Sequence, residues 1–351
     1  MVTVSDRLGP GLCAALQPGA GLEQVGAELS RVVARVVAHD ALRCGVMNPS
    51  TGWGVTSLAF WHGYPPDLGR ALLSVDGIKA DVRELLRQAS PVVVADLGLR
   101  SDAPDPLPAS HPQPARHPQP ATYRVGEELR VALRDARGVW GVLCLLRAAG
   151  GRPFDDADAW RIAGLGPSLI AALRGYVTAK PGAPAEREPP PGMLVIGADD
   201  RVRAMTPQAR PWLDAMKAQL AVPDWLTESS FASLAAAARE HPEPPRLCVP
   251  SVGTGWWTAI EAQPLGDDGD GDVAVVIQRA TGTLLLPSFC DWYGITTRER
   301  QVMRHLHGGS APKQIARAFD LSVHTVNDHL KAIFRKTGTG GRDELMAVIN
   351  A

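Results

Sequence analysis

The 351-residue chain lacks long apolar runs and an excess of either charge. No stretch approaches the roughly 18 consecutive apolar residues of a membrane-spanning helix, and the N-terminus has no signal-peptide pattern. The 36 Lys and Arg residues are nearly balanced by 37 Asp and Glu. We therefore expect a cytoplasmic protein with no membrane partner.

Common catalytic and metal-binding motifs are also missing. The sequence has no G-x-S-x-G motif, no phosphate-binding P-loop and no cluster of metal ligands. Its five cysteines are scattered without C-x-x-C spacing, as is typical of reduced thiols in a cytosolic chain. No cofactor is indicated, and we expect the protein not to be an enzyme.

The last sixty residues, by contrast, predict a helix-turn-helix. Thr296 and Glu299 have the spacing of a capping box, which indicates a helix that begins there and ends near His307. Ser310 is expected to cap a short second helix, and Ser322 a longer third helix. A short helix, a tight turn and a longer helix are the parts that fill a DNA major groove.

The predicted third helix has two distinct faces. Its apolar stripe has spacings of four, three and four residues and consists of Val326, Leu330, Ile333 and Thr337. The opposite face carries His324, Asn327, Asp328, Lys331 and Arg335. Gly338 is expected to end this helix, and residues 342–349 to form a fourth helix that covers the core.

These positions resemble the C-terminal domain of LuxR-type transcription regulators. The matching elements, in the family's order and spacing, are T-x-R-E, a Gly before the second helix, Q-I-A, S-x-x-T-V-x-x-H-L, K-x-G and a closing Arg342. The resemblance implies a transcription regulator that binds promoter or operator DNA through residues 292–351, with RNA polymerase as a further partner. The chain departs from the family at Asn327, where many relatives carry a base-contacting lysine, and at Asp328, which adds a negative charge.

Side-chain chemistry suggests which residues contact DNA. Asn327 suits adenine, Lys331 suits guanine, and His324 or Asp328 suits a neighbouring base. Candidates for phosphate contacts are Thr325, Arg335, Lys336 and Lys313. The last sixty residues hold nine Lys and Arg against five Asp and Glu, which favours DNA. An amphipathic helical module that binds protein is the alternative.

A single DNA-binding head covers only a half-site, so we expect a homodimer. A helix predicted over residues 155–176 carries apolar residues with the spacing of a helix-packing seam. They are Ile162, Leu165, Leu169, Leu173 and Tyr176. This stripe forms either a dimer interface or a surface buried against the chain's own sheet.

Prolines mark the joints between domains. Twelve of the 30 prolines fall within residues 100–124 and 178–192. The first stretch, residues 100–124, predicts an extended surface insertion, and residues 178–191 predict a linker.

The region before the linker has the pattern of an α+β sensor domain over residues 21–177, after an N-terminal tail at residues 1–20. Apolar periodicity predicts helices over residues 22–37 and 155–176, with strands over 44–47, 54–61, 91–95, 127–133 and 139–146. The segments Glu127–Arg130 and Trp140–Leu143, with Arg147 and Pro153-Phe154, resemble GAF-like sensor domains found ahead of LuxR-type domains. The resemblance implies a small-molecule ligand, whose pocket Trp53, Trp61 and Trp140 would line unless they are core residues.

Residues 192–282 form a second α+β unit that resembles a PAS domain, and residues 283–291 a second linker. The predicted fold class is therefore one or more α+β sensor domains followed by an all-α four-helix LuxR-type helix-turn-helix domain. The competing function is a GAF-fold cysteine redox enzyme or sensor, as in free methionine sulfoxide reductases, with Cys44 and Cys144 as its reactive residues and the helical module binding protein.

Overall fold

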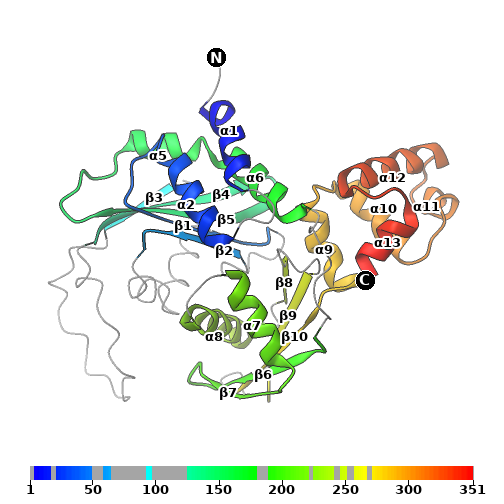
Figure 1. Cartoon of the computed structure of the whole chain (residues 1–351). Coiled ribbons are helices and arrows are strands. Elements are labelled where there is room, and N and C mark those ends of the chain that lie inside the picture. Colours follow the sequence, from blue (N-terminus) through cyan, green and yellow to red (C-terminus); the bar gives the residue numbers. More distant parts are fainter. Residues whose placement is uncertain are drawn as a thin grey trace.

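The computed structural model describes residues 4–16, 21–49, 58–64, 92–96, 125–179, 189–220, 224–240, 246–250, 257–266 and 271–350. Two antiparallel five-stranded sheets with helices packed on them precede a group of helices that ends at the C-terminus (Figure 1). The predicted order, an α+β region and then a helical region, is confirmed. The predicted insertion at residues 100–124 and most of the linker at 178–191 lie outside the described residues.

The first sheet has the strand order β2-β1-β5-β4-β3. Its strands are β1 (Ala41–Val46), β2 (Leu58–His62), β3 (Val92–Asp96), β4 (Val125–Asp135) and β5 (Gly138–Ala148). Alternating apolar residues place one set of side chains, including Leu143 and Leu145, in the main core. The five predicted strands are confirmed in position, with shifts at their ends.

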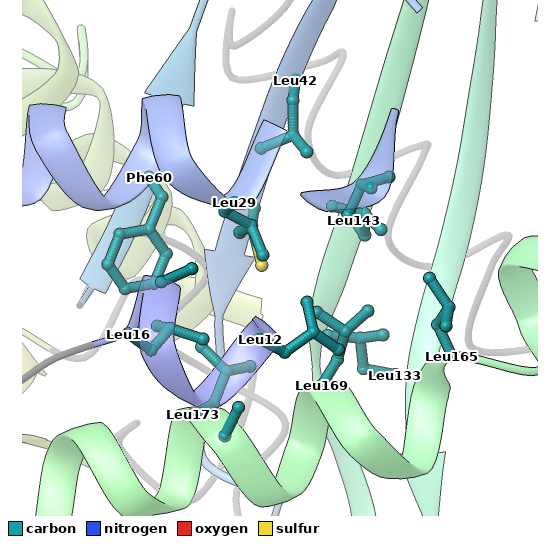
Figure 2. Close-up of a cluster of buried hydrophobic side chains, with 14 of the residues drawn as sticks. Leu12, Leu16, Leu29, Leu42, Phe60, Leu133, Leu143, Leu165, Leu169 and Leu173 are labelled. Atoms are coloured by element: carbon teal, nitrogen blue, oxygen red, sulfur yellow. The ribbon is translucent and has the colours of Figure 1, made fainter. Parts of the chain in front are cut away.

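Helices α1 (Val4–Ala15), α2 (Leu22–Val33) and α6 (Gly166–Thr178) contribute to that same core. Figure 2 shows Leu12 of α1 and Leu16, which directly follows that helix, beside Leu169 and Leu173 of α6, with Leu29 of α2 close by. The predicted N-terminal tail is thus largely a helix, because its apolar residues are buried: Leu12 is fully inaccessible to solvent.

One expectation about the last helix of this region is wrong. The single helix predicted over residues 155–176 is divided into α5 (Asp156–Ala163) and α6. Gly164 ends α5, and Pro167, which has no N–H to donate, lies in the first turn of α6. Of the two alternatives for the stripe from Ile162 to Tyr176, the structure shows burial within the chain, since each of its five members is at most 2% exposed in the chain's own core.

The second sheet has the strand order β7-β6-β10-β9-β8. Its strands are β6 (Gly192–Ile196), β7 (Val202–Met205), β8 (Arg246–Pro250), β9 (Trp257–Pro264) and β10 (Val273–Arg279). Helices α7 (Ala209–Leu220) and α8 (Asp224–Glu240) pack on one face through Trp212, Phe231 and Leu234. Asp200 has a φ of 59° in the turn between β6 and β7, as expected for a hairpin turn that favours Asp.

The linker predicted at residues 283–291 is wrong. These residues lie in helix α9 (Gly282–Trp292), which leads from the second sheet to α10 (Thr297–His307), α11 (Pro312–Ala318), α12 (Val323–Thr337) and α13 (Arg342–Asn350) (Figure 1). The reason is hydrophobic: Leu285, Leu286 and Phe289 are buried in one core with α10 to α13.

Within the described residues, no helix is both long and apolar enough to span a membrane.

Candidate nucleic-acid interface

The first helix of the C-terminal group begins as the sequence predicts. The Thr296 hydroxyl accepts a hydrogen bond from the Glu299 backbone N–H at 3.3 Å, and a Glu299 carboxylate oxygen accepts one from the Thr296 N–H at 2.7 Å. This reciprocal capping box satisfies two backbone donors at the start of α10. It fixes where α10 begins relative to α9.

The cap of the second helix lies one residue later than predicted. Ala311 precedes α11, and the Gln314 side chain accepts a hydrogen bond from the Ala311 backbone N–H at 2.7 Å, so Ser310 is not the capping residue. The turn after α11 contains Asp320 with a φ of 52°, a left-handed conformation that Asp tolerates better than most residues. Leu321 then donates its backbone N–H to Ala316 at 2.9 Å, which closes the turn.

Helix α12 has the two faces that its sequence predicts. Ser322 caps it by accepting a hydrogen bond from the Thr325 N–H at 3.0 Å, and Gly338 ends it with a φ of 67°. The buried residues of the helix are Val326, Leu330, Ile333 and Thr337. The packing of this stripe against α10 and α11 determines which face of α12 meets solvent.

That solvent face carries most of the predicted DNA contacts. The exposed polar side chains on α12 are those of His324, Asn327, Asp328, Lys331 and Arg335. Thr325 is partly buried, and its hydroxyl lies 2.8 Å from that of the cap residue Ser322. Asp328 lies between His324 and Lys331, with N···O separations of 3.5 Å and 3.7 Å. The face thus presents mixed donors and acceptors along one side of the helix.

Lys336 has a role that the sequence did not suggest. Its ammonium group donates to a Glu299 carboxylate oxygen at 2.6 Å, and the two side chains are 25% and 7% exposed. Burial raises the pKa of Glu299, but hydrogen bonds from Lys336 and Thr296 outweigh it and leave the pKa below its ordinary value. Lys336 therefore ties the end of α12 to the start of α10.

One exposed basic residue, Arg317, was not among the DNA contacts predicted from the sequence. Arg317 follows Lys313 by four residues on α11, and both side chains are exposed, so the two charges share one side of that short helix. Their spacing of four residues in the sequence could have indicated that the two side chains share a helix face. The pair places two exposed positive charges on α11.

Helix α9 connects these helices to the rest of the chain through buried contacts. Trp292, the last residue of α9, is 2% exposed and belongs to the core of the first sheet. Asn48, which follows β1, contacts the Ser288 hydroxyl of α9. Leu285 and Phe289 on the same helix belong to the core of α10 to α13. One short helix therefore contributes to two cores.

Arginines from the first sheet region hold the C-terminal end of α9. Arg137 donates to the backbone carbonyl of Asp291 at 2.9 Å, and Arg174 donates to that of Trp292 at 3.0 Å. Cations are favourable at this end of a helix, where carbonyls are left without intrahelical partners. The Asp291 carboxylate, which is buried, pairs with Arg300 of α10 at 2.5 Å.

The cysteines of the competing redox function lie in unfavourable places. Cys44 and Cys144 are both buried, and burial raises the pKa of each thiol to about 12, which nearby Arg43 only partly offsets at Cys144. They also lie in separate clusters, Cys44 in the main core and Cys144 with Met47 and Val142. Such thiols are protonated and inaccessible.

Comparison with known proteins identifies the C-terminal region. Residues 294–349 match the family described as bacterial regulatory proteins, luxR family. The chain is also similar to the monoamine regulon transcriptional regulator of Klebsiella aerogenes, with 40% identity over 53 residues. That match covers 15% of this chain and 23% of the relative, so the chain spans less than a quarter of the length of this curated relative. The C-terminal region is thus a LuxR-family domain.

Solved structures show weaker similarity over longer stretches. A VqmA–ligand–DNA complex from Vibrio cholera is 20% identical, over 45% of this chain and 80% of that one, with a TM-score of 0.22. A bacteriophytochrome from R. palustris is 13% identical, over 78% and 62% of the two chains, with a TM-score of 0.25. TM-scores this low establish neither the fold nor the function of the N-terminal regions.

Proposed function

We propose that the chain is a sequence-specific DNA-binding transcription regulator that inserts α12 into the major groove. The observation that carries this proposal is that α12, which lies in a LuxR-family domain, has two different faces. One face is a buried stripe, and the other presents five exposed polar or charged residues. A helix of this kind, preceded by a short helix and a turn, suits groove insertion. Base edges then supply specificity, and phosphates supply much of the affinity.

Individual contacts follow from the side chains. Asn327 and Lys331 are assigned to adenine and guanine, with His324 or Asp328 at a neighbouring base. Lys313, Arg335 and Thr325 are assigned to phosphates, and Arg317 joins them. Lys336 is a weaker candidate for a phosphate than its charge suggests, because its ammonium group is already paired with Glu299.

The two α+β regions are proposed to be sensory, of GAF-like and PAS-like type, with a small-molecule ligand bound by the first. Helix α9 supports such coupling, because Trp292 is in the core of the first sheet while Asp291 pairs with Arg300 of the DNA-binding domain. A ligand that shifts the first sheet region would therefore act on the position of α10. RNA polymerase is a further proposed partner, and the proposed location is the cytoplasm.

A homodimer is also proposed, because two heads on adjacent turns of DNA bind more tightly than one. Its interface lies outside the stripe from Ile162 to Tyr176, which the chain buries itself.

An enzymatic role for Cys44 and Cys144 is not favoured, since a redox nucleophile must be accessible and deprotonated.

The test uses the full-length protein. Purified protein is mixed with sheared genomic DNA, the bound fragments are sequenced, and affinity for the enriched fragments is measured at several salt concentrations. We expect the bound fragments to share a short sequence. We also expect the logarithm of the binding constant to fall linearly with the logarithm of the salt concentration. The matched control is a variant with Asn327, Lys331 and Arg335 replaced by Ala, which leaves the buried stripe intact. Binding that is absent, or equal for both proteins on every fragment, would overturn the proposal.

A further inference from the structure

Within α12, all of which the structure describes, Asp328 is the only acidic residue. Its side chain is 55% exposed and lies at the middle of the polar face. One carboxylate oxygen is 3.7 Å from Lys331 Nζ, and the other is 3.5 Å from His324 Nε2. Exposed pairs of this type contribute little to stability, so the carboxylate can exchange them for another donor.

A carboxylate at this position disfavours most of what DNA presents. Phosphates are negative, and in the major groove guanine O6 and N7, adenine N7 and thymine O4 are all hydrogen-bond acceptors. An ionised Asp only accepts hydrogen bonds, so it repels each of these groups. The donors in the groove are the amino groups of cytosine and adenine. Of the two, cytosine suits Asp328 better, because adenine places its N7 acceptor next to the amino group.

Lys331 has the opposite requirement, since an ammonium group only donates and therefore suits guanine O6 and N7. Its separation of 3.7 Å from Asp328 is similar to the rise of about 3.4 Å between stacked base pairs. The two side chains therefore present an acceptor and a donor at a spacing that neighbouring base edges also have. A cytosine next to a guanine offers the complementary arrangement.

Resting on the proposed DNA-binding function, we infer that Asp328 is a specificity-determining residue: it selects a cytosine amino group beside the guanine that Lys331 contacts, and it rejects guanine and thymine by repulsion. The residue thus acts mainly against wrong sequences. Its charge lowers affinity for DNA in general and sharpens the choice of one base pair.

The experiment compares full-length wild type with Asp328→Asn on a library of duplexes randomised within the site enriched from the genome. Asn removes the charge, keeps the size and offers both a donor and an acceptor. Asp320→Asn is the matched control, because it removes the same charge from the exposed turn before α12, where Asn tolerates the left-handed φ of 52°.

We expect wild type to prefer cytosine at one position by roughly tenfold, within the range for a good base contact. Asp328→Asn should remove that preference by binding guanine- and thymine-containing sites more tightly, while Asp320→Asn keeps it. If Asp328→Asn strengthens binding to all duplexes equally and leaves every base preference unchanged, the residue is only a general repulsive charge and the inference is wrong. If wild type itself selects no site, the proposed function fails instead, so the two failures are distinguishable.

Discussion

Trp292 at the end of α9 meets Trp140 of β5 edge to face, with ring centroids 5.2 Å apart and an interplanar angle of 80°. Both side chains are almost completely buried, and Arg174 lies over the Trp140 ring at 5.6 Å. Trp292 directly precedes the LuxR-family domain, so its burial joins that domain to the first sheet region. Aromatic contacts of this geometry add stability beyond the area they bury.

The first prediction concerns this contact. Trp292→Ala should lower the free energy of unfolding by roughly 3 to 5 kcal/mol, because it leaves a cavity between two packed regions. In calorimetry of the full-length protein, we expect the C-terminal helices to unfold in a transition separate from that of the first sheet region. Trp292→Phe should cost much less, since the Trp292 indole N–H has no hydrogen-bond partner among the described residues. Trp160→Ala is the matched control, because that side chain is 76% exposed; an equal effect at both positions would contradict the prediction.

The second prediction concerns the core of the DNA-binding domain. Leu330→Ala should destabilise the domain by about 2 to 5 kcal/mol, because Leu330 is buried among α10, α11 and α12. The measurement is thermal unfolding of the full-length protein, with Val323→Ala as the control since Val323 is exposed at the start of α12. A loss below about half a kilocalorie for Leu330→Ala, the size of an ordinary surface substitution, would mean that this stripe does not form the core.

The third prediction concerns the pair between Glu299 and Lys336. Lys336→Met keeps the aliphatic stem and removes the donor, so it should cost roughly 1 to 3 kcal/mol by leaving a buried carboxylate oxygen without that partner. The pKa of Glu299 is lower in the folded state than its ordinary value of 4.5 in the unfolded state. The pair therefore stabilises the domain at pH values above 4.5. That stability is lost as pH falls through the folded pKa. A Glu299→Gln variant should show a smaller loss of stability on acidification than wild type.

The fourth prediction concerns the thiols. With an aromatic disulfide reagent at neutral pH, native protein should show fast reaction of the exposed Cys13 and no reaction of Cys44 or Cys144, whose pKa values are raised to about 12 by burial. All five cysteines should react once the chain is unfolded. Fast labelling of Cys144 in a folded Cys13→Ser variant would reopen the redox interpretation.

Local sequence signals predicted the C-terminal domain closely. Thr296, Ser322 and Gly338 make their capping contacts with residues three or four positions away, and the stripe of α12 needs only helical periodicity. The same periodicity could not distinguish a dimer seam from a core helix at Leu169. That choice depends on Leu12 of α1 and on the adjacent Leu16, both of which come from a segment expected to be a tail.

Contacts between residues far apart in the sequence also limited what the sequence could predict. Residues 283–291 were predicted to be a linker, yet Ser288 and the adjacent Trp292 contact residues more than a hundred positions earlier in the chain. The pairing of Lys336 with Glu299 likewise joins helices that only the fold brings together. Charge alone therefore suggested a phosphate contact where the structure has an ion pair.

The last prediction separates base contacts from phosphate contacts. Lys331→Ala should cost about 1 to 3 kcal/mol on the enriched site and relax discrimination at one base pair, because the exposed ammonium group of Lys331 is assigned to a guanine edge. Lys313→Ala, on α11, should weaken binding by a similar factor on every duplex and reduce the salt slope by about 1, because it would remove one phosphate contact. Fluorescence anisotropy with the enriched duplex and a scrambled duplex, each over a range of salt, measures both quantities. Equal losses on the two duplexes for Lys331→Ala would reassign that residue to the backbone, and a sequence-dependent loss for Lys313→Ala would place α11 closer to the bases than its position before the turn suggests.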